Sequence, residues 1–231
     1  CRSWQAPAVA GRPEAGLASG DLNVARVVNI HPDSPQQRLL AQAADFIRKG
    51  ALVALPTDSC YALGCHLGDK EALDRIRQIR QMDERHHLTL MVRDLSEIAH
   101  FARVDNAQYR LLKAATPGSY TFILEGSKEL PRRVMHPKRK TIGLRVPDHP
   151  VALALLEELN EPLLTTTLQL PGDEFPLTEG WEIQDRLEDQ LELILDAGTC
   201  GTEPTTIIDL TGAAPELIRA GRGPLELFGL G

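Results

Sequence analysis

Apolar residues recur along the chain with two periods, one typical of strands and one typical of helices. Residues 23–30 alternate apolar and polar side chains and are rich in valine, which predicts a strand. A helical spacing runs from Ser34 to Ile47, and Gly50 stands just past its end, where a glycine commonly terminates a helix. The short apolar run at 51–56 predicts a strand that is buried on both faces.

The rest of the chain continues to interleave the two patterns. Asp69, Asp94 and Asp105 each precede a helical spacing, and an aspartate in that position can accept hydrogen bonds from the first turn. Pro117 and Gly118 interrupt the third of these helices. Further strands are predicted at 88–94, 119–124, 141–146, 162–170, 191–196, 205–210 and 216–221, with a helix at 151–159.

Several of these strands follow one another without an intervening helix. This order predicts an α/β protein with a single domain, in which a twisted mixed parallel and antiparallel sheet carries helices packed around it. No repeat of fixed period is present, which argues against solenoids and propellers. We expect residues 1–22 to be a disordered tail, partly left from an expression vector, and residues 23–231 to form the domain.

Composition narrows the class of protein. The chain is 42% hydrophobic and 25% charged, and no apolar run is long enough to span a bilayer, so we expect a soluble protein without a membrane partner. Four scattered cysteines in 231 residues do not form a disulfide framework, which favours reduced thiols and a cytoplasmic location.

The charge distribution points to a local anion site. The net charge of −7 argues against a surface covered with nucleic acid, yet basic residues gather in two short stretches. Such stretches indicate a basic concave cavity, although two solvated charged faces would give the same pattern. The stretches are Lys70, Arg75, Arg77, Arg80 and Arg85, and then Arg132, Arg133, Lys138, Arg139, Lys140 and Arg145.

A segment dense in small polar side chains follows the buried strand at 51–56. It reads PTDSCYALGC, from Pro56 to Cys65, and it leaves the strand end at the place where α/β sheets usually bind ligands. Thr57, Asp58, Ser59 and Tyr61 would present hydroxyl groups and a carboxylate there. The same residue types also serve as ordinary turn and cap residues, so this segment alone does not establish a site.

Five segments, taken in order, resemble a known family. PTDSCYALGC looks like the PTDTxYGLG motif of the YrdC/YciO-like family of threonylcarbamoyl-AMP synthases, which act on the way to a modified adenosine of transfer RNA. TPGSYTFIL at 116–124 is similar to its PGPxT segment, IGLRVPDHP at 142–150 to VxVRxP, EPTTIIDL at 203–210 to PSTVVDL, and LIRAG at 217–221 to RxG. The amino-acid sequence around Arg93 and Lys138 is most similar to that of the YciO branch.

The resemblance implies a YrdC-like fold and a site for threonine, bicarbonate and ATP, with Mg²⁺ bound through the nucleotide and pyrophosphate released. It implies no protein nucleophile, because the carbamate oxygen would attack the α-phosphorus itself, so no catalytic residue is assigned. Threonine would lie beside Thr57, Tyr61 and Thr121. The nucleotide and its phosphates would lie beside Arg80, Arg145, Thr165, Thr167, Thr206 and Arg219.

Two positions depart from the family pattern. Met82 stands where relatives have the second cation of their phosphate motif, and TTTLQL replaces STSAN, which puts Thr167 and Gln169 in place of serine and asparagine. Loss of a phosphate-binding cation can remove several kcal/mol of transition-state stabilisation, roughly the effect of deleting one strong donor from an active site. Weak or redirected activity is therefore an expectation too.

Two other functions are open on the sequence. The basic stretches could bind structured RNA or tRNA through its backbone without any catalysis, whereas aromatic residues, at 4%, are too few for a base-stacking binder of single strands. Cys60, Cys65 and His66 lack the paired spacing of structural zinc sites, so we predict that no protein side chains hold a metal. Small buried apolar residues are the better interpretation of both cysteines.

Overall fold

The computed structural model describes residues 24–83 and 88–230 of the 231-residue chain. The predicted tail at residues 1–22 and the predicted phosphate-site neighbour Arg85 lie outside the described residues. None of the helices in the described part is long and apolar enough to cross a membrane.

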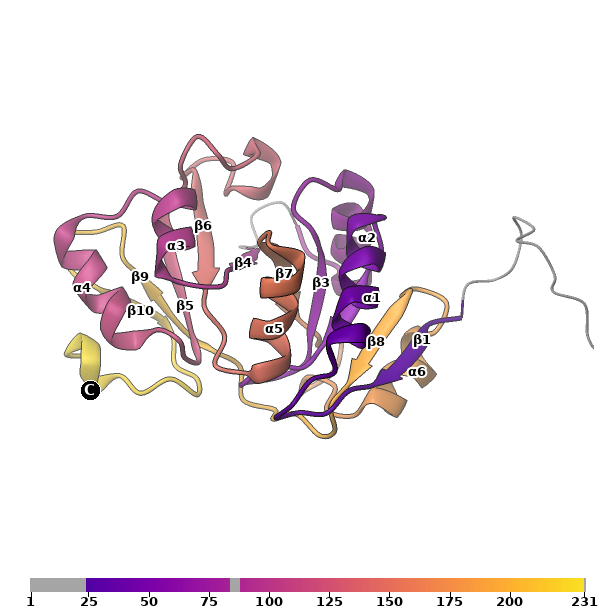
Figure 1. Ribbon diagram of the computed structural model, residues 1–231. Helices are drawn as coiled ribbons and strands as arrows, with labels where there is room; N and C mark the ends of the chain where they lie inside the picture. Colours follow the sequence, from indigo (N-terminus) through magenta and orange to yellow (C-terminus); the bar gives the residue numbers. More distant parts are fainter. Residues whose placement is uncertain (1–23, 84–87, 231) are drawn as a thin grey trace, which may run out of the picture.

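Ten strands within the described residues form one sheet, in the order β1-β8-β2-β3-β7-β4-β6-β5-β9-β10 (Figure 1). Neighbouring strands pair in parallel at β1/β8, β8/β2, β4/β6 and β5/β9, and the other five pairs are antiparallel. The predicted mixed α/β sheet is thus confirmed. The strands are β1 (Arg26–Asn29), β2 (Val53–Leu55), β3 (Ala62–His66), β4 (Thr89–Met91), β5 (Tyr120–Glu125), β6 (Thr141–Arg145), β7 (Leu163–Thr167), β8 (Leu193–Asp196), β9 (Thr206–Asp209) and β10 (Glu216–Arg219).

The helices begin where the sequence supplies a cap. Asp69, Asp94 and Asp105 each accept a hydrogen bond from a backbone N–H of the first helical turn, as predicted. Gly50, two residues past the last residue of α1, has a φ of +89°, a conformation in which a side chain would be strained. The helices are α1 (Gln37–Arg48), α2 (Lys70–Arg80), α3 (Leu95–Phe101), α4 (Asn106–Ala115), α5 (Pro150–Leu159) and α6 (Gly180–Leu187), with short 3₁₀ turns η1 (Arg132–Val134) and η2 (Glu226–Phe228).

Two elements were not predicted from the sequence. The second half of the Pro56–Cys65 segment, expected to be a loop, forms β3, which lies between β2 and β7 and pairs antiparallel with both. Gly64 permits this packing, because a Cβ atom there would come within 2.8 Å of the Leu163 side chain. Helix α6 was missed although Gly180, Ile183 and Leu187 are buried at helical spacing.

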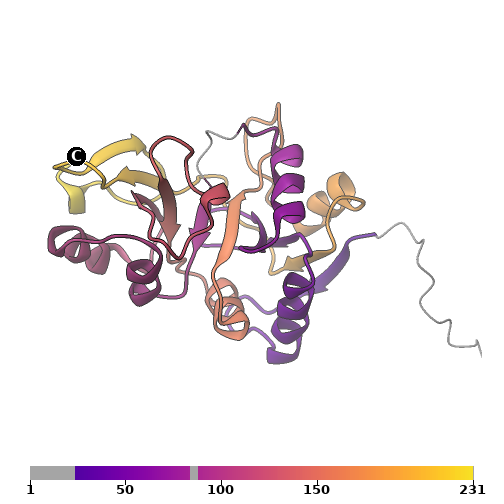
Figure 2. The same cartoon turned by 90° about the horizontal axis from the view of Figure 1, so that it is seen from above.

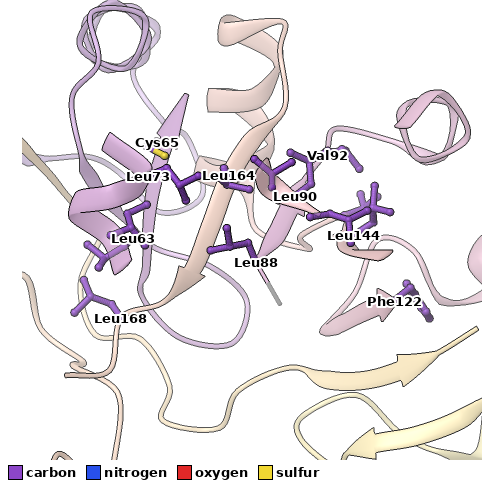
Figure 3. Close-up of a cluster of buried hydrophobic side chains, with 14 of the residues drawn as sticks. Leu63, Cys65, Leu73, Leu88, Leu90, Val92, Phe122, Leu144, Leu164 and Leu168 are labelled. Carbon is purple, nitrogen blue, oxygen red and sulfur yellow. The ribbon is translucent and has the colours of Figure 1, made fainter. Parts of the chain in front are cut away.

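Helices cover the sheet through two apolar cores. The larger core joins α2, α3, α4 and α6 to the sheet, and the smaller core is formed with α1 and α5, which lie side by side in both views (Figures 1 and 2). Figure 3 shows the larger core continuing from Leu63 on β3 through Leu164, Leu90 and Leu144 to Phe122 on β5. All five side chains are completely buried.

Candidate functional site

Strand alternation directs a set of polar side chains to the sheet face opposite the larger core. Leu90 and Leu144 are paired neighbours on β4 and β6, and both belong to that core. Successive residues of a strand point to opposite faces. Thr89, Gly143 and Arg145 therefore point away from the larger core, toward the face that carries α1 and α5.

A hollow forms where the cover of α1 and α5 stops. Met91 and Leu163 are paired on β4 and β7 and belong to the smaller core, whereas the next pair on that face consists of Thr89 and Thr165. The hollow is small and open to solvent, with about 290 Å³ of free space counted out to that solvent. It is lined by Ser59, Cys60, Tyr61, Ala62, Thr89, Thr121, Arg145, Thr165, Thr166, Thr167 and Thr205.

Arg145 is the central cation of this hollow. It is only 6% exposed, and its Nη2 donates to the hydroxyl oxygens of Thr57 at 3.2 Å and Ser59 at 3.1 Å and to the carboxylate of Asp58. The Ser119 hydroxyl donates to the same carboxylate. The segment after β2 thus folds back onto the end of β6 and holds its arginine in place.

The electrostatics of the Asp58–Arg145 pair are those of a partly desolvated ion pair. Burial alone would raise the pKa of the Asp58 carboxyl, but the charge of Arg145 and the hydrogen bonds from Ser119 and Arg145 hold that pKa below its ordinary value. One N–H donor of Arg145 is not used by this pair, because its Nε is buried without a hydrogen-bond partner among the described residues. An anion entering the hollow would meet this cation.

Thr57 and Tyr61 use their hydroxyl groups within the protein. Thr57 Oγ1 donates to the carbonyl of Cys60 at 2.6 Å, and it also accepts from Arg145. The hydroxyl of Tyr61 donates to the carbonyl of Gly198 at 2.7 Å, and burial raises its pKa. Tyr61 borders the hollow, but its phenol oxygen is bound to the chain beyond β8.

The cysteines behave as small apolar residues. Cys60 and Cys65 are 2% and 0% exposed, and burial raises the pKa of Cys60 to about 11 and that of Cys65 to about 12. The thiolate is the reactive form of cysteine, so neither thiol is set up as a nucleophile at neutral pH. The interpretation of both residues as core side chains is confirmed by their burial.

Strands β5 and β9 bring a pair of threonine hydroxyl groups to the hollow. Thr121 on β5 and Thr205, just before β9, lie with their hydroxyl oxygens 2.9 Å apart. The Nη2 of Arg219 on β10 donates to the backbone carbonyl of Thr205 at 2.9 Å. Arg219 is therefore connected to the hollow through Thr205.

The remaining predicted residues lie at different depths. Thr165 and Thr167 line the hollow, and the Thr165 hydroxyl donates to the carbonyl of Thr89 at 3.1 Å. Thr206 is completely buried and does not line the hollow. Its hydroxyl donates to the carbonyl of Gly223 at 2.6 Å, so its contact ties β9 to the C-terminal segment.

Arg80 stands apart from the hollow, at the last residue of α2. It is half-buried, its Nε has no hydrogen-bond partner among the described residues, and burial lowers its pKa. Met82, two residues on, packs against the larger core and accepts a weak hydrogen bond from Thr166. Arg77, an earlier arginine of α2, donates to the carbonyl of Arg133 at 3.2 Å and pairs with Asp74 at 3.6 Å.

Gln169, the second departure from the family pattern, is engaged in local structure. Its Nε2 donates to the backbone carbonyls of Asp173 at 3.0 Å and Glu174 at 3.2 Å. These bonds shape the connection between β7 and α6, so the amide is directed to the backbone of its own loop.

Sequence reasoning named Asp58 and Ser59 as polar groups at a strand end, but it gave no role to Ser119 or Thr89. The partner of Asp58 and Ser59 is Arg145, which lies 87 positions from Asp58, and Ser119 donates to Asp58 from the segment at 116–124. Thr89 gave no signal beyond that of a strand residue. Among the described residues, no group of three or more His, Cys, Asp or Glu side chains could hold a metal ion.

Known proteins resemble this chain in sequence and in fold. A family model described as telomere recombination, for the group Sua5, YciO and YrdC, matches residues 45–221. The YciO protein of Escherichia coli is 55% identical over 199 residues, which cover 86% of this chain and 97% of that protein. Its crystal structure superposes with a TM-score of 0.86 at 53% identity, over 88% of this chain and 99% of the other.

More distant relatives have names that describe an activity or a ligand. A threonylcarbamoyl-AMP synthase of Pyrococcus abyssi is 32% identical over 187 residues, which cover 80% of this chain and 54% of the synthase. The crystal structure of P. abyssi Sua5 complexed with L-threonine superposes with a TM-score of 0.81 at 28% identity, over 89% of this chain and 61% of the other.

Proposed function

Because the chain belongs to the Sua5/YciO/YrdC family, we propose that it binds ATP and threonine at the Arg145 hollow and forms threonylcarbamoyl-AMP from them with bicarbonate. The observation that carries the proposal is the buried Arg145, which faces a hollow bordered by six threonines: Thr89, Thr121, Thr165, Thr166, Thr167 and Thr205. Desolvated cations and hydroxyl donors are the groups that bind carboxylate and phosphate oxygens.

The reaction needs no covalent step on the protein. The amine of threonine takes up bicarbonate with loss of water to give a carbamate. A carbamate oxygen then attacks the α-phosphorus of ATP, the bond from that phosphorus to the bridging oxygen breaks, and pyrophosphate leaves. The contribution of the protein is to hold the reactants in line and to stabilise the charge that gathers on the phosphate oxygens.

The residues divide into two roles under this proposal. Tyr61 and Thr121, which line the hollow, would border the amino acid, and Thr57, which does not line it, would act by holding Arg145. The structure of a relative with L-threonine supports an amino-acid site in this fold. Arg145, Thr165, Thr167 and Arg219 lie on the side of the phosphates. Thr206 would support that side from the interior, because it is completely buried.

Mg²⁺ would arrive with ATP and be held chiefly by its phosphates. Asp58 is the carboxylate that holds Arg145, and it also accepts a hydrogen bond from Ser119. A carboxylate so engaged leaves little capacity for a metal ion, which fits a cation brought in by the nucleotide.

Turnover with the substrates is the direct test. We expect pyrophosphate release that requires both threonine and bicarbonate, at a low rate because Met82 and Gln169 supply no phosphate donor in this structure. Arg80 does not line the hollow, so its part in the proposal is that the triphosphate extends from the hollow to the end of α2, where the Nε of Arg80 has no hydrogen-bond partner among the described residues. Titration calorimetry with Mg·ATP should then show that Arg80→Ala weakens binding by about ten- to a hundredfold, the effect of a lost charged hydrogen bond.

Arg38→Ala is the matched control for that titration. Arg38 is also a helical arginine, it is exposed, and it makes no hydrogen bond or ion pair among the described residues. It should leave binding unchanged. Absence of both ATP binding and pyrophosphate release would rule out the proposed reaction.

Binding of structured RNA without catalysis is the second candidate. Arg132, Lys138 and Arg139 are exposed on the connection between β5 and β6, whereas Arg75 of the other basic stretch is paired with Glu192 at 2.8 Å. A duplex held through its phosphates should bind less tightly as salt rises, in a straight line on logarithmic axes. An affinity for duplex RNA that does not change between low and physiological salt would remove this candidate.

A further inference from the structure

A second and larger hollow lies at the far end of the β5–β6 hairpin. Residues 126–140 leave β5 and return to β6 as a closed loop, since the Gly126 N–H donates to the Lys140 carbonyl at 3.0 Å. The loop encloses a hollow of about 1340 Å³ of free space, counted out to open solvent. Glu125 borders it and lies four residues along β5 from Thr121, or about 13 Å at the rise of a strand.

The loop is held rigidly enough to form a site. Leu130 and Val134 are buried and belong to the larger core, which fixes the loop to the sheet. Arg133 anchors the outer side, because its Nη2 donates to the carbonyl of Gly68 and its own carbonyl accepts from Arg77. Compact loops with close ends and internal packing are frequently functional.

The charge that lines this hollow is predominantly positive. Arg103, Lys128, Arg132 and Lys140 border it, against a single carboxylate, that of Glu125, which pairs with Arg103 at 3.0 Å. Among the described residues, the side chains of Lys128, Arg132 and Lys140 make no hydrogen bond or ion pair. All three side chains are exposed, and together they give this concavity a local positive charge in a chain whose net charge is −7, which favours the binding of an anion.

Apolar side chains form part of the same wall. Leu130 is 4% exposed, and Met135 is partly buried against the core. Gly126 makes room for Met135, because a Cβ atom at position 126 would lie 2.5 Å from its sulfur. A ligand in this hollow would thus meet both cations and apolar side chains.

We propose that the 126–140 loop is a second anion site, which binds a small organic polyphosphate such as a nucleoside polyphosphate. Lys128, Arg132 and Lys140 would contact the phosphate groups, and Leu130 and Met135 would contact the organic part. The hollow is confined to one hairpin loop and the neighbouring Arg103 and Glu125, which suits a compact ligand, whereas a duplex presents its phosphates along a longer surface. This site is separate from the Arg145 hollow and does not depend on the proposed synthesis.

The test is a titration of the isotope-labelled protein followed by amide NMR shifts, with ionic strength held constant. The probes are inorganic tripolyphosphate and Mg·ATP. We expect saturable shifts of the amides of residues 126–140 with both probes, and tighter binding of ATP because of its organic part. In Lys128→Gln and Lys140→Gln, binding at the loop should weaken about tenfold or more for each cation removed, while shifts around Arg145 remain.

Lys138→Gln is the matched control. Lys138 is an exposed cation of the same loop that does not border the hollow, so its removal should leave the loop affinity within about twofold. The proposal is overturned by loop amides that do not shift with either probe, or by equal weakening in Lys138→Gln and Lys128→Gln. It is also overturned if a duplex RNA shifts the loop and the small polyphosphates do not.

Discussion

The Arg145→Met variant is expected to lose Mg·ATP binding by at least about a hundredfold and to be less stable by about 3–5 kcal/mol. The loss of binding follows because the substitution removes the buried cation of the hollow. The loss of stability follows because Asp58, whose side chain is 9% exposed, is left as a buried charge without its partner. Titration calorimetry and urea unfolding measure the two effects separately.

The stability effect should depend on pH in a defined direction. In the unmodified protein the pKa of Asp58 is lowered, so the ion pair contributes stability above the unfolded pKa of about 3.9 and loses it as pH falls through the folded value. In the variant, burial without Arg145 raises that pKa. The difference in stability between the two proteins should therefore be largest near about pH 7 and shrink toward about pH 4.

Two further variants test whether the loss of stability comes from leaving a buried charge without its partner. Arg186→Met removes a surface arginine that holds Asp173 through two hydrogen bonds, at 2.7 and 3.1 Å, and it should cost no more than about 1 kcal/mol. The double variant Asp58→Asn/Arg145→Met removes both buried charges and should regain much of the stability without regaining ATP binding. Binding by Arg145→Met at the unmodified affinity would place the nucleotide elsewhere.

Local signals in the sequence were sufficient for most of the fold. Asp69, Asp94 and Asp105 could be assigned as caps because each acts on its own first turn, within three residues. β3 could not be assigned in the same way. Its short run of small residues becomes a strand because β2 and β7 pair with it on its two sides, and β7 lies about a hundred positions away in the sequence.

The site was predictable in part for the same reason. Arg145 stands out in the sequence because a strand arginine between two apolar residues must point to the opposite face. Its pairing with Asp58 could not be read, since it depends on how the end of β6 meets the segment after β2. The hydroxyls of Tyr61 and Thr206 bind carbonyls 137 and 17 positions away, which no local pattern reveals.

Side chains alternate between the two faces of β5, and the one at Phe122, which faces the larger core, gives the second large expected effect, a loss of stability. Phe122 is completely buried in the larger core, next to Tyr120 and Phe228, with ring centroids 5.8 and 5.9 Å away. The Phe122→Ala variant is expected to lose about 3–5 kcal/mol of unfolding free energy, because the removed ring leaves a cavity that close-packed neighbours cannot fill. Urea unfolding monitored by circular dichroism measures this loss, with the dependence of the unfolding free energy on urea concentration unchanged between the two proteins.

Phe122→Leu is the matched control, and it should cost about 1–1.5 kcal/mol because it keeps most of the volume. Thr121, the preceding residue, faces the Arg145 hollow, so both variants should keep ligand affinity within about threefold while they remain folded. If Phe122→Ala instead lost affinity as strongly as Arg145→Met at temperatures where it is fully folded, the two faces of β5 would not be independent. The site would then depend on the packing of the larger core as well as on its own hydrogen bonds.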